Sequence, residues 1–209
     1  MKIIFRLLCC ALCVLLLLPL CACNVKIDDE AAFLAEVAEL IERSYEVNEL
    51  FFGEGLPFVD PEGKSAAELV SEASGELNAR TIYRPVAEDA LYQTESEIMD
   101  LARSVYSEDY ANHLQTVGFT GVSDENETVA TYARYITTVE GGLTINMESV
   151  TKAIPLTRRF DTATLAVVRL GRDYAVVSAD AYDGDTKTGS VQLRVNKEPS
   201  GWRLDWPTY

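Results

Sequence analysis

The sequence predicts an α+β protein in which N-terminal helices pack on one face of a curved antiparallel sheet. Two observations lead to this fold class: apolar residues recur at helical spacing in the first half of the chain, and they alternate with polar residues in the second half. Helices followed by strands are typical of α+β folds. We expect the helical part at about residues 28–117 and the sheet at about 127–209, within a single domain that spans 23–209.

The first 22 residues are typical of a lipoprotein signal peptide. Lys2 and Arg6 give a positive start, and an unbroken apolar run covers residues 7–18. The segment Leu20-Cys21-Ala22-Cys23 resembles the lipobox of bacterial lipoproteins, which implies that Cys23 is lipidated and anchors the chain on the extracytoplasmic face of the cell membrane. The alternative is an uncleaved transmembrane anchor, because the apolar segment approaches the ~17–25 residues that a span needs.

Cysteine content and charge exclude several classes of function. All five cysteines lie at or before Cys23, so the mature chain would have no disulfide, no cysteine-protease nucleophile and no thiolate metal site. The whole chain has a net charge of −15, and residues 23–128 hold 24 acids against 6 bases. Such acidity argues against binding to nucleic acid or to anionic lipid. The acidic block is either a solvated surface or a face that steers a basic partner.

The helices are predicted in order from spacing and capping signals. The first is expected over Asp29–Phe52 and a shorter one over Ser65–Ser74, while residues 76–93 are expected to be irregular or extended. Thr94 to Glu97 forms a capping box, and Ser107 is expected to cap a short helix. Four glutamates lie between the apolar positions of the first helix and are the candidate binding residues, on the face opposite the apolar stripe: Glu36, Glu39, Glu42 and Glu46.

The strands are predicted from alternation and from the turn residues between them. Leu143–Met147, Val191–Asn196 and Trp202–Trp206 alternate, whereas Thr164–Leu170 and Tyr174–Ala179 are more continuously apolar and are expected to be central. The turn signals are Gly141-Gly142, Gly171, Asp183-Gly184 and Pro199-Ser200-Gly201. Strands at this spacing predict an antiparallel meander.

No catalytic signature emerges from the side chains, so we expect no catalytic residues, no cofactor and no metal. His113 is the only histidine, and no G-x-S-x-G motif accompanies it. Asp180, Asp183 and Asp185 could be oxygen ligands for calcium, but Asp183-Gly184 also suits a tight hairpin turn. A pair of carboxylates could hydrolyse a glycoside, but the chain has 33 acids, so almost any fold would bring two of them to the required separation.

The aromatic and basic side chains have two interpretations, as ordinary structural contacts or as the lining of a binding concavity. The aromatic residues form cross-strand or core pairs, or they line a concavity of the sheet: Tyr132, Tyr135, Trp202, Trp206 and Tyr209. Arginines either make ordinary cross-strand charge pairs or line an opposing face: Arg158, Arg159, Arg169, Arg172, Arg194 and Arg203.

Several short segments between residues 80 and 209 carry a resemblance to small extracytoplasmic proteins of Gram-positive bacteria. These segments are Tyr83-Arg84-Pro85-Val86, Thr94-Glu95-Ser96-Glu97, Val105 to Tyr110 and Gly201 to Asp205. Their order is similar to that of the inhibitors of cell-wall D,L-endopeptidases, and a broader NTF2-like or cystatin-like assignment is equally open. The inhibitor family implies a non-enzymatic lipoprotein whose partner is a cell-wall hydrolase or another envelope protein. The alternative is a ligand-binding lipoprotein that uses an NTF2-like sheet concavity for a small molecule or wall fragment.

Overall fold

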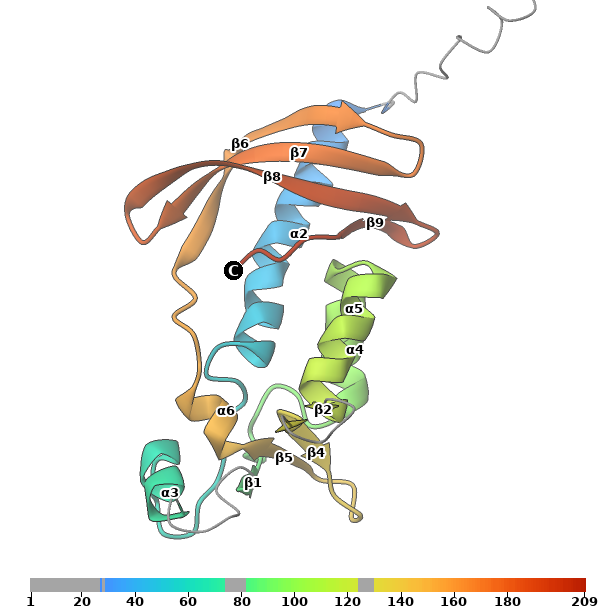
Figure 1. Cartoon of the computed structure of the whole chain (residues 1–209). Helices are drawn as coiled ribbons and strands as arrows, with labels where there is room; N and C mark the ends of the chain where they lie inside the picture. Colours follow the sequence, from blue (N-terminus) through green and yellow to red (C-terminus); the bar gives the residue numbers. More distant parts are fainter. Residues whose placement is uncertain (1–26, 28, 74–81, 124–129) are drawn as a thin grey trace, which may run out of the picture.

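The computed structural model describes residues 27, 29–73, 82–123 and 130–209, and it combines helices with antiparallel sheets (Figure 1). The helices are α2 (Glu30–Phe51), α3 (Ala66–Ala73), α4 (Glu95–Val105), α5 (Glu108–Gln115), the π-helical turn η3 (Thr116–Thr120) and α6 (Met147–Thr151). The strands are β1 (Tyr83–Pro85), β2 (Val122–Ser123), β3 (Ala130–Thr131), β4 (Tyr135–Thr137), β5 (Leu143–Asn146), β6 (Arg158–Leu170), β7 (Tyr174–Asp183), β8 (Thr186–Glu198) and β9 (Gly201–Leu204). None of the described helices is long and apolar enough to cross a membrane.

Helix α2 connects the two ends of the molecule. Asp29 caps it by accepting a hydrogen bond from the amide of Ala32, at 3.0 Å. Its buried residues recur every three or four positions, which confirms the predicted helix and its apolar stripe: Phe33, Val37, Leu40, Ile41, Ser44, Val47, Asn48, Leu50 and Phe51. The helix runs from beneath the four-stranded sheet toward the small sheet, beside α4 (Figure 1).

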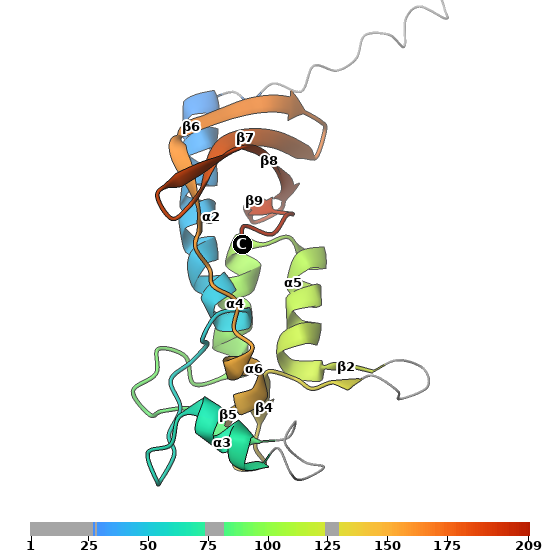
Figure 2. The ribbon, with the colours of Figure 1, turned by 60° about the vertical axis from the view of Figure 1, so that its left-hand side comes forward.

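The four-stranded sheet is an antiparallel meander in the order β6-β7-β8-β9, and it curves over α2 (Figure 2). In β7, Ala175, Val177, Ala179 and Ala181 are buried and alternate with partly exposed residues. Helix α2 contacts β6 and β9, and the rings of Phe33 and Trp202 lie 4.9 Å apart, edge to face. The inner face of the sheet is therefore filled by α2.

The expectation of one sheet for all the strands is wrong. Strand β5 pairs with β4 on one side and on the other with β1, which comes from the helical part of the chain, while β2 pairs with β3 in a separate ribbon. Asn146 explains why β5 does not continue: its side chain accepts hydrogen bonds from the amides of Glu148 and Ser149 and so caps α6. Met147, expected in the strand, is the first residue of that helix.

The expectation that Thr164–Leu170 is central is also wrong, because β6 is an edge strand of the meander. Its pairing with β7 shifts register between Asp161 and Ala166 and again between Val167 and Arg169. These irregularities break the two-residue alternation, so the segment looks continuously apolar although Val168 is half exposed. Tyr174–Ala179 is central as expected. Trp206 lies beyond β9 and is 54% exposed.

The predicted caps of the short helices are confirmed. The side chain of Thr94 accepts from the amide of Glu97, and Glu97 accepts from the amide of Thr94, so both halves of the capping box are present. Ser107 caps α5 by accepting from the amide of Tyr110. Residues 82–93 contain only β1 and irregular backbone, in agreement with the expectation for that stretch, and residues 74–81 lie outside the described part.

The C-terminal end of α2 is closed by residues that precede and begin β4. Tyr135 donates its hydroxyl to the carbonyl of Leu50 at 2.8 Å and accepts from the amide of Leu56 at 3.3 Å. Arg134, 4% exposed, donates to the carbonyls of Gly53 and Ser149. A cation is favourable here because the C-terminal end of a helix is partly negative.

Candidate functional site

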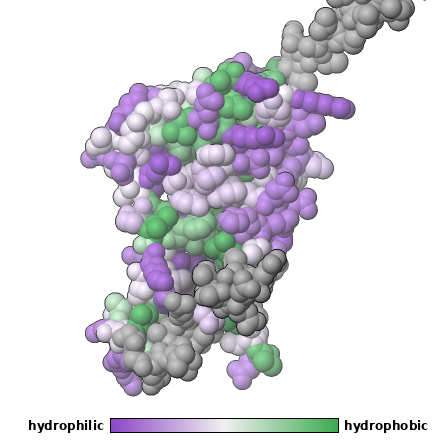
Figure 3. Space-filling view, in the orientation of Figure 1, coloured by the Kyte–Doolittle hydropathy of each residue, from purple (hydrophilic) through white to green (hydrophobic). Residues whose placement is uncertain are grey.

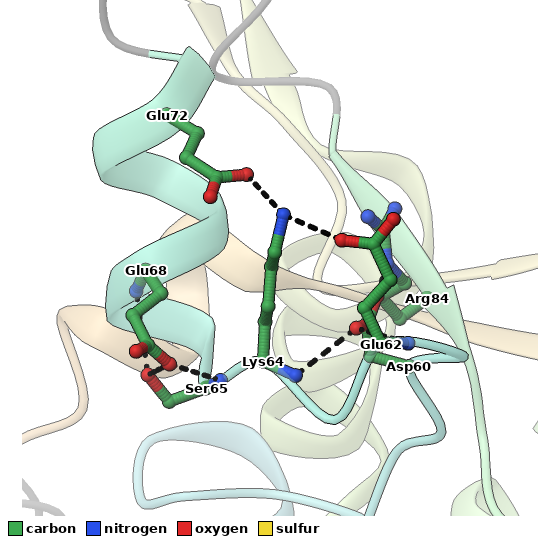
Figure 4. A network of polar contacts seen from close by, with 7 residues as sticks. All are labelled: Asp60, Glu62, Lys64, Ser65, Glu68, Glu72 and Arg84. Carbon is green, nitrogen blue, oxygen red and sulfur yellow. Dashed lines mark hydrogen bonds and ion pairs between the residues drawn. The ribbon is translucent and has the colours of Figure 1, made fainter.

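The acids in the first half of the chain fall into two groups, those with internal partners and those without. Figure 4 shows one partnered group, which joins α3 and the segment before it to β1. Asp60 accepts from Arg84 at 2.9 Å and from the amides of Glu62 and Lys64 at 3.0 Å. The amide of Lys64 and the guanidinium of Arg84 together hold the pKa of Asp60 below its usual range.

The rest of this network is paired in the same way. The ammonium of Lys64 lies 2.7 Å from the carboxylates of both Glu62 and Glu72, which raise its pKa, and Glu68 accepts from the hydroxyl and amide of Ser65 (Figure 4). Lys64 and Arg84 offset part of the charge of these four acids, and each acid is held by an ion pair or hydrogen bond within the network. We therefore interpret this network as a structural brace for α3 and β1.

The acids of α2 differ because several of them have no counter-ion. Glu39 and Glu42 are exposed, and none of the ion pairs found among the described residues includes an acid of α2. Glu46 is exposed and accepts a hydrogen bond from the hydroxyl of Tyr92 at 2.6 Å. Burial and this hydrogen bond raise the pKa of Tyr92 to about 12. We call Glu39, Glu42 and Glu46 the acidic face.

Glu36 does not belong to the acidic face, which corrects the expectation that all four glutamates lie opposite the apolar stripe. It is partly buried, and its carboxylate accepts a hydrogen bond from the amide of Trp202 at 3.0 Å. Glu36 lies at the border of the stripe, between Phe33 and Val37, and so reaches β9. Its role is to join α2 to the sheet.

The sheet hollow does not gather the predicted aromatic and basic residues. Three of the aromatic residues pack against other parts of the protein: Tyr135 is buried at the end of α2, Trp202 packs on Phe33, and the ring centre of Tyr209 lies 4.3 Å from that of Phe52. The other two do not line the sheet, because Trp206 is exposed beyond β9 and Tyr132 lies outside the strands. The arginines are spread over separate regions. Arg159 stacks 4.4 Å from the ring centre of Tyr45, and Arg169 and Arg194 lie at 5.7 and 4.7 Å from that of Tyr174. Arg158 donates to the carbonyl of Tyr209, Arg203 donates to that of Arg103, and Arg172 is exposed. They do not form one opposing face.

The remaining candidates are the histidine and the three aspartates at the β7–β8 hairpin. His113 is exposed on α5, 6.0 Å from the ring centre of Tyr110. Asp183 precedes the two-residue turn between β7 and β8, where Gly184 has φ +56°, so the tight-turn interpretation is confirmed. Asp180 pairs with Lys187 at 2.5 Å. Within the described ranges, no three acids, histidines or cysteines are placed to hold a metal ion, and Cys23 lies outside those ranges.

A polar groove, which the sequence did not indicate, lies between the α4–α5 junction and the β8–β9 turn. Its volume is about 330 Å³, and it is lined by Arg103, Tyr106, Glu108, Asn112, Glu198 and Ser200. A second cavity, of about 20 Å³, has room for about one water molecule beside Thr208 and Tyr209. The view in Figure 3 is largely hydrophilic, with apolar residues in separate groups. The cap at Ser107 and the turn at Pro199-Ser200-Gly201 were both visible in the sequence, but nothing local showed that they meet.

Comparisons with known proteins give no relative. No family model matches the chain, and neither a curated protein nor a solved structure is similar to it.

Proposed function

We propose that this chain is a membrane-tethered, extracytoplasmic, non-enzymatic binding protein that docks a basic protein on the acidic face of α2. The proposed tether is the lipid on Cys23. The proposed partner class is a cell-wall hydrolase, with a D,L-endopeptidase as the first candidate to test. On this proposal the curved meander and α2 correspond to the sheet and helix of an NTF2-like or cystatin-like fold.

One observation supports the acidic face over the paired network around Lys64. Glu39 and Glu42 are exposed on successive turns of α2 and form no ion pair among the described residues, whereas Asp60, Glu62 and Glu72 are already paired. Uncompensated charge of one sign raises the rate of association with an oppositely charged partner. A ligand in the sheet hollow is the weaker alternative, because buried residues of α2 and the sheet belong to one apolar cluster there.

The test is the association of the chain with a purified D,L-endopeptidase, followed by surface binding kinetics and by release of peptides from peptidoglycan. We expect the triple change Glu39→Gln, Glu42→Gln and Glu46→Gln to slow association several-fold at low salt and to change dissociation little. The difference should disappear near 1 M salt, where the Debye length falls to about 3 Å. The glutamine introduced at position 46 retains an oxygen that can accept from Tyr92, so the fold should persist.

The matched control removes charge of the same sign elsewhere. Glu140→Gln, Asp173→Asn and Asp185→Asn together remove three charges at exposed turn residues in the second half of the chain and should leave the association rate nearly unchanged. If the control slows association as much as the triple change does, the effect is one of net charge and the docking proposal is wrong. If the endopeptidase neither binds nor loses activity, that partner class is wrong.

A further inference from the structure

The polar groove between the α4–α5 junction and the β8–β9 turn has walls that are tied together. Arg203, in β9, donates from Nε to the carbonyl of Arg103 at 2.9 Å and from Nη2 to the hydroxyl of Ser200 at 3.0 Å. Glu198 accepts from the amide of Glu108 at 2.9 Å. These bonds link the end of α4 and the start of α5 to the turn, so the groove keeps its shape without a ligand.

Backbone contacts hold the same junction. The amide of Ser107 donates to the carbonyl of Leu204 at 2.8 Å, and the Ser107 hydroxyl donates to the carboxylate of Asp205. Tyr106 forms a parallel bridge with Leu204 immediately before this contact. A site with fixed walls loses little conformational entropy when a ligand binds, which favours recognition of small molecules.

The groove is lined by side chains of both charge signs that form no ion pair among the described residues. Arg103 is exposed, and of its five N–H donors one bonds to Gln115, at 3.2 Å. Glu198 uses only Oε1 in its bond to the backbone, and the side chain of Glu108 is exposed. No ion pair among the described residues includes any of these three side chains. The exposed amide of Asn112 lies at the same groove.

We propose that this groove binds a small zwitterion, a free amino acid or short peptide that has both an ammonium and a carboxylate group. Arg103 would bind the carboxylate, while Glu108 and Glu198 would receive the ammonium, so a molecule that has both groups gains charge-assisted hydrogen bonds at both ends. A volume of about 330 Å³ is at the lower end of small-molecule sites, which suits a dipeptide. The site is separate from the acidic face of α2, and this proposal does not depend on the proposed partner.

The test titrates the whole chain, in detergent, with alanyl-alanine and with two capped forms of it, and follows the amide signals of Asn112 and Ser200 by NMR. N-acetylation removes the ammonium and C-terminal amidation removes the carboxylate. We expect the free dipeptide to shift both signals and each capped form to bind about tenfold more weakly. The L,L and D,D forms are compared in parallel to find the preferred hand.

Two variants locate the site. Arg103→Gln and Glu198→Gln should each weaken binding of the free dipeptide about tenfold, and the side-chain amide introduced at position 198 still offers an oxygen to the Glu108 amide. Arg172→Gln and Glu140→Gln, which remove exposed charges elsewhere, should have no effect. Thermal unfolding of each variant shows whether the fold is kept, and Arg103→Lys, which retains the charge, should bind better than Arg103→Gln.

Three results would overturn the proposal. The first is the absence of any shift at millimolar dipeptide. The second is equal binding of the free and capped dipeptides, because recognition would then not depend on the two charges. The third is a shift that survives both groove variants, which would place the binding elsewhere. None of these results bears on the endopeptidase, since that protein is absent from the titration.

Discussion

The hydroxyl of Thr208 lies 2.6 Å from the hydroxyl of Ser44, although 164 residues separate them in the sequence. The same Thr208 oxygen accepts from the side-chain amide of Asn48 at 2.7 Å and lies 3.1 Å from the hydroxyl of Tyr106. All four residues are buried. The members of this cluster are hydrogen-bond partners of one another where α2, the end of α4 and the last residues of the chain meet. They fix how these three segments are placed relative to one another.

Thr208→Val should therefore destabilise the protein. Valine has nearly the same shape but leaves the side-chain amide of Asn48 without its acceptor in a buried site, which costs about 1–3 kcal/mol. Chemical denaturation of the variant measures this loss in the free energy of unfolding. Thr186→Val, at an exposed position in β8, is the control and should change stability by less than ~0.5 kcal/mol. Equal effects would mean that the cluster contributes nothing specific.

Tyr135→Phe should weaken the C-terminal end of α2. The change removes the donor to the Leu50 carbonyl and the acceptor of the Leu56 amide, and the expected cost is again about 1–3 kcal/mol. Hydrogen exchange of the amides in the last turn of α2 should become faster. Tyr132→Phe serves as the comparison because Tyr132 is 43% exposed. Unchanged exchange in α2 would show that Tyr135 does not close the helix.

The stability of the protein should fall at alkaline pH. Burial raises the pKa of Tyr106 from 10.0 to about 12, and hydrogen bonds with Thr208, Ser44 and Asn48 offset only part of this rise. The folded state then holds the phenol proton more tightly than the unfolded state does. Its contribution is complete below pH 10 and is lost between about pH 10 and 12, at up to about 1.4 kcal/mol per pH unit.

Tyr106→Phe isolates this contribution. Denaturation curves between pH 8 and 12 should show a variant that is less stable at pH 8, because Asn48 loses a donor, but that declines less steeply above pH 10. A parallel decline in the variant and the natural chain would exclude Tyr106 as its source. Burial also raises the pKa of Tyr110, the next contribution to examine.

Cys23→Ser should release the chain from membranes or block its processing. The reason is the position of Cys23 after Leu20-Cys21-Ala22, which predicts that it is the lipidated residue. Phase partitioning in a detergent that clouds on warming measures the change, with the natural chain expected in the detergent phase. Cys21→Ser is the control and should partition as the natural chain does. Unchanged partitioning of Cys23→Ser would contradict lipid anchoring at this residue.

Local signals predicted helices α2 to α5 but not η3 or α6, and long-range pairing limited the prediction of the sheets. The caps at Asp29 and Thr94 act within three residues of themselves, so the sequence alone located the starts of α2 and α4. Strand β1 is three residues long and ends in a proline, so it shows no alternation. Its partner is β5, about 60 residues later in the sequence. Only the folded chain reveals that β4 and β5 belong to this small sheet and not to the meander.

The candidate site was predicted in part for the same reason. Helical spacing separated Glu39, Glu42 and Glu46 from the apolar stripe, but it could not show that Trp202 lies beside Glu36. The partner of Glu46, Tyr92, comes from a loop without a regular pattern. The groove depends on the meeting of Arg103 with Ser200 through Arg203, a contact across about 100 residues that no local motif encodes.

Thr208 is synthesised long after the helix that it contacts, and this order affects how the chain folds. The residues that cover the apolar stripe of α2 near Phe33 and Ser44 include Trp202 and Thr208, which are made more than 160 residues afterwards. At typical synthesis rates this interval lasts roughly 8–30 s. During that time the part of the stripe near Phe33 lacks this cover, although α4 can already pack on the rest, and contacts so distant in sequence form slowly. The N-terminal part of α2 should therefore bind chaperones on the unfinished chain until β9 docks on it.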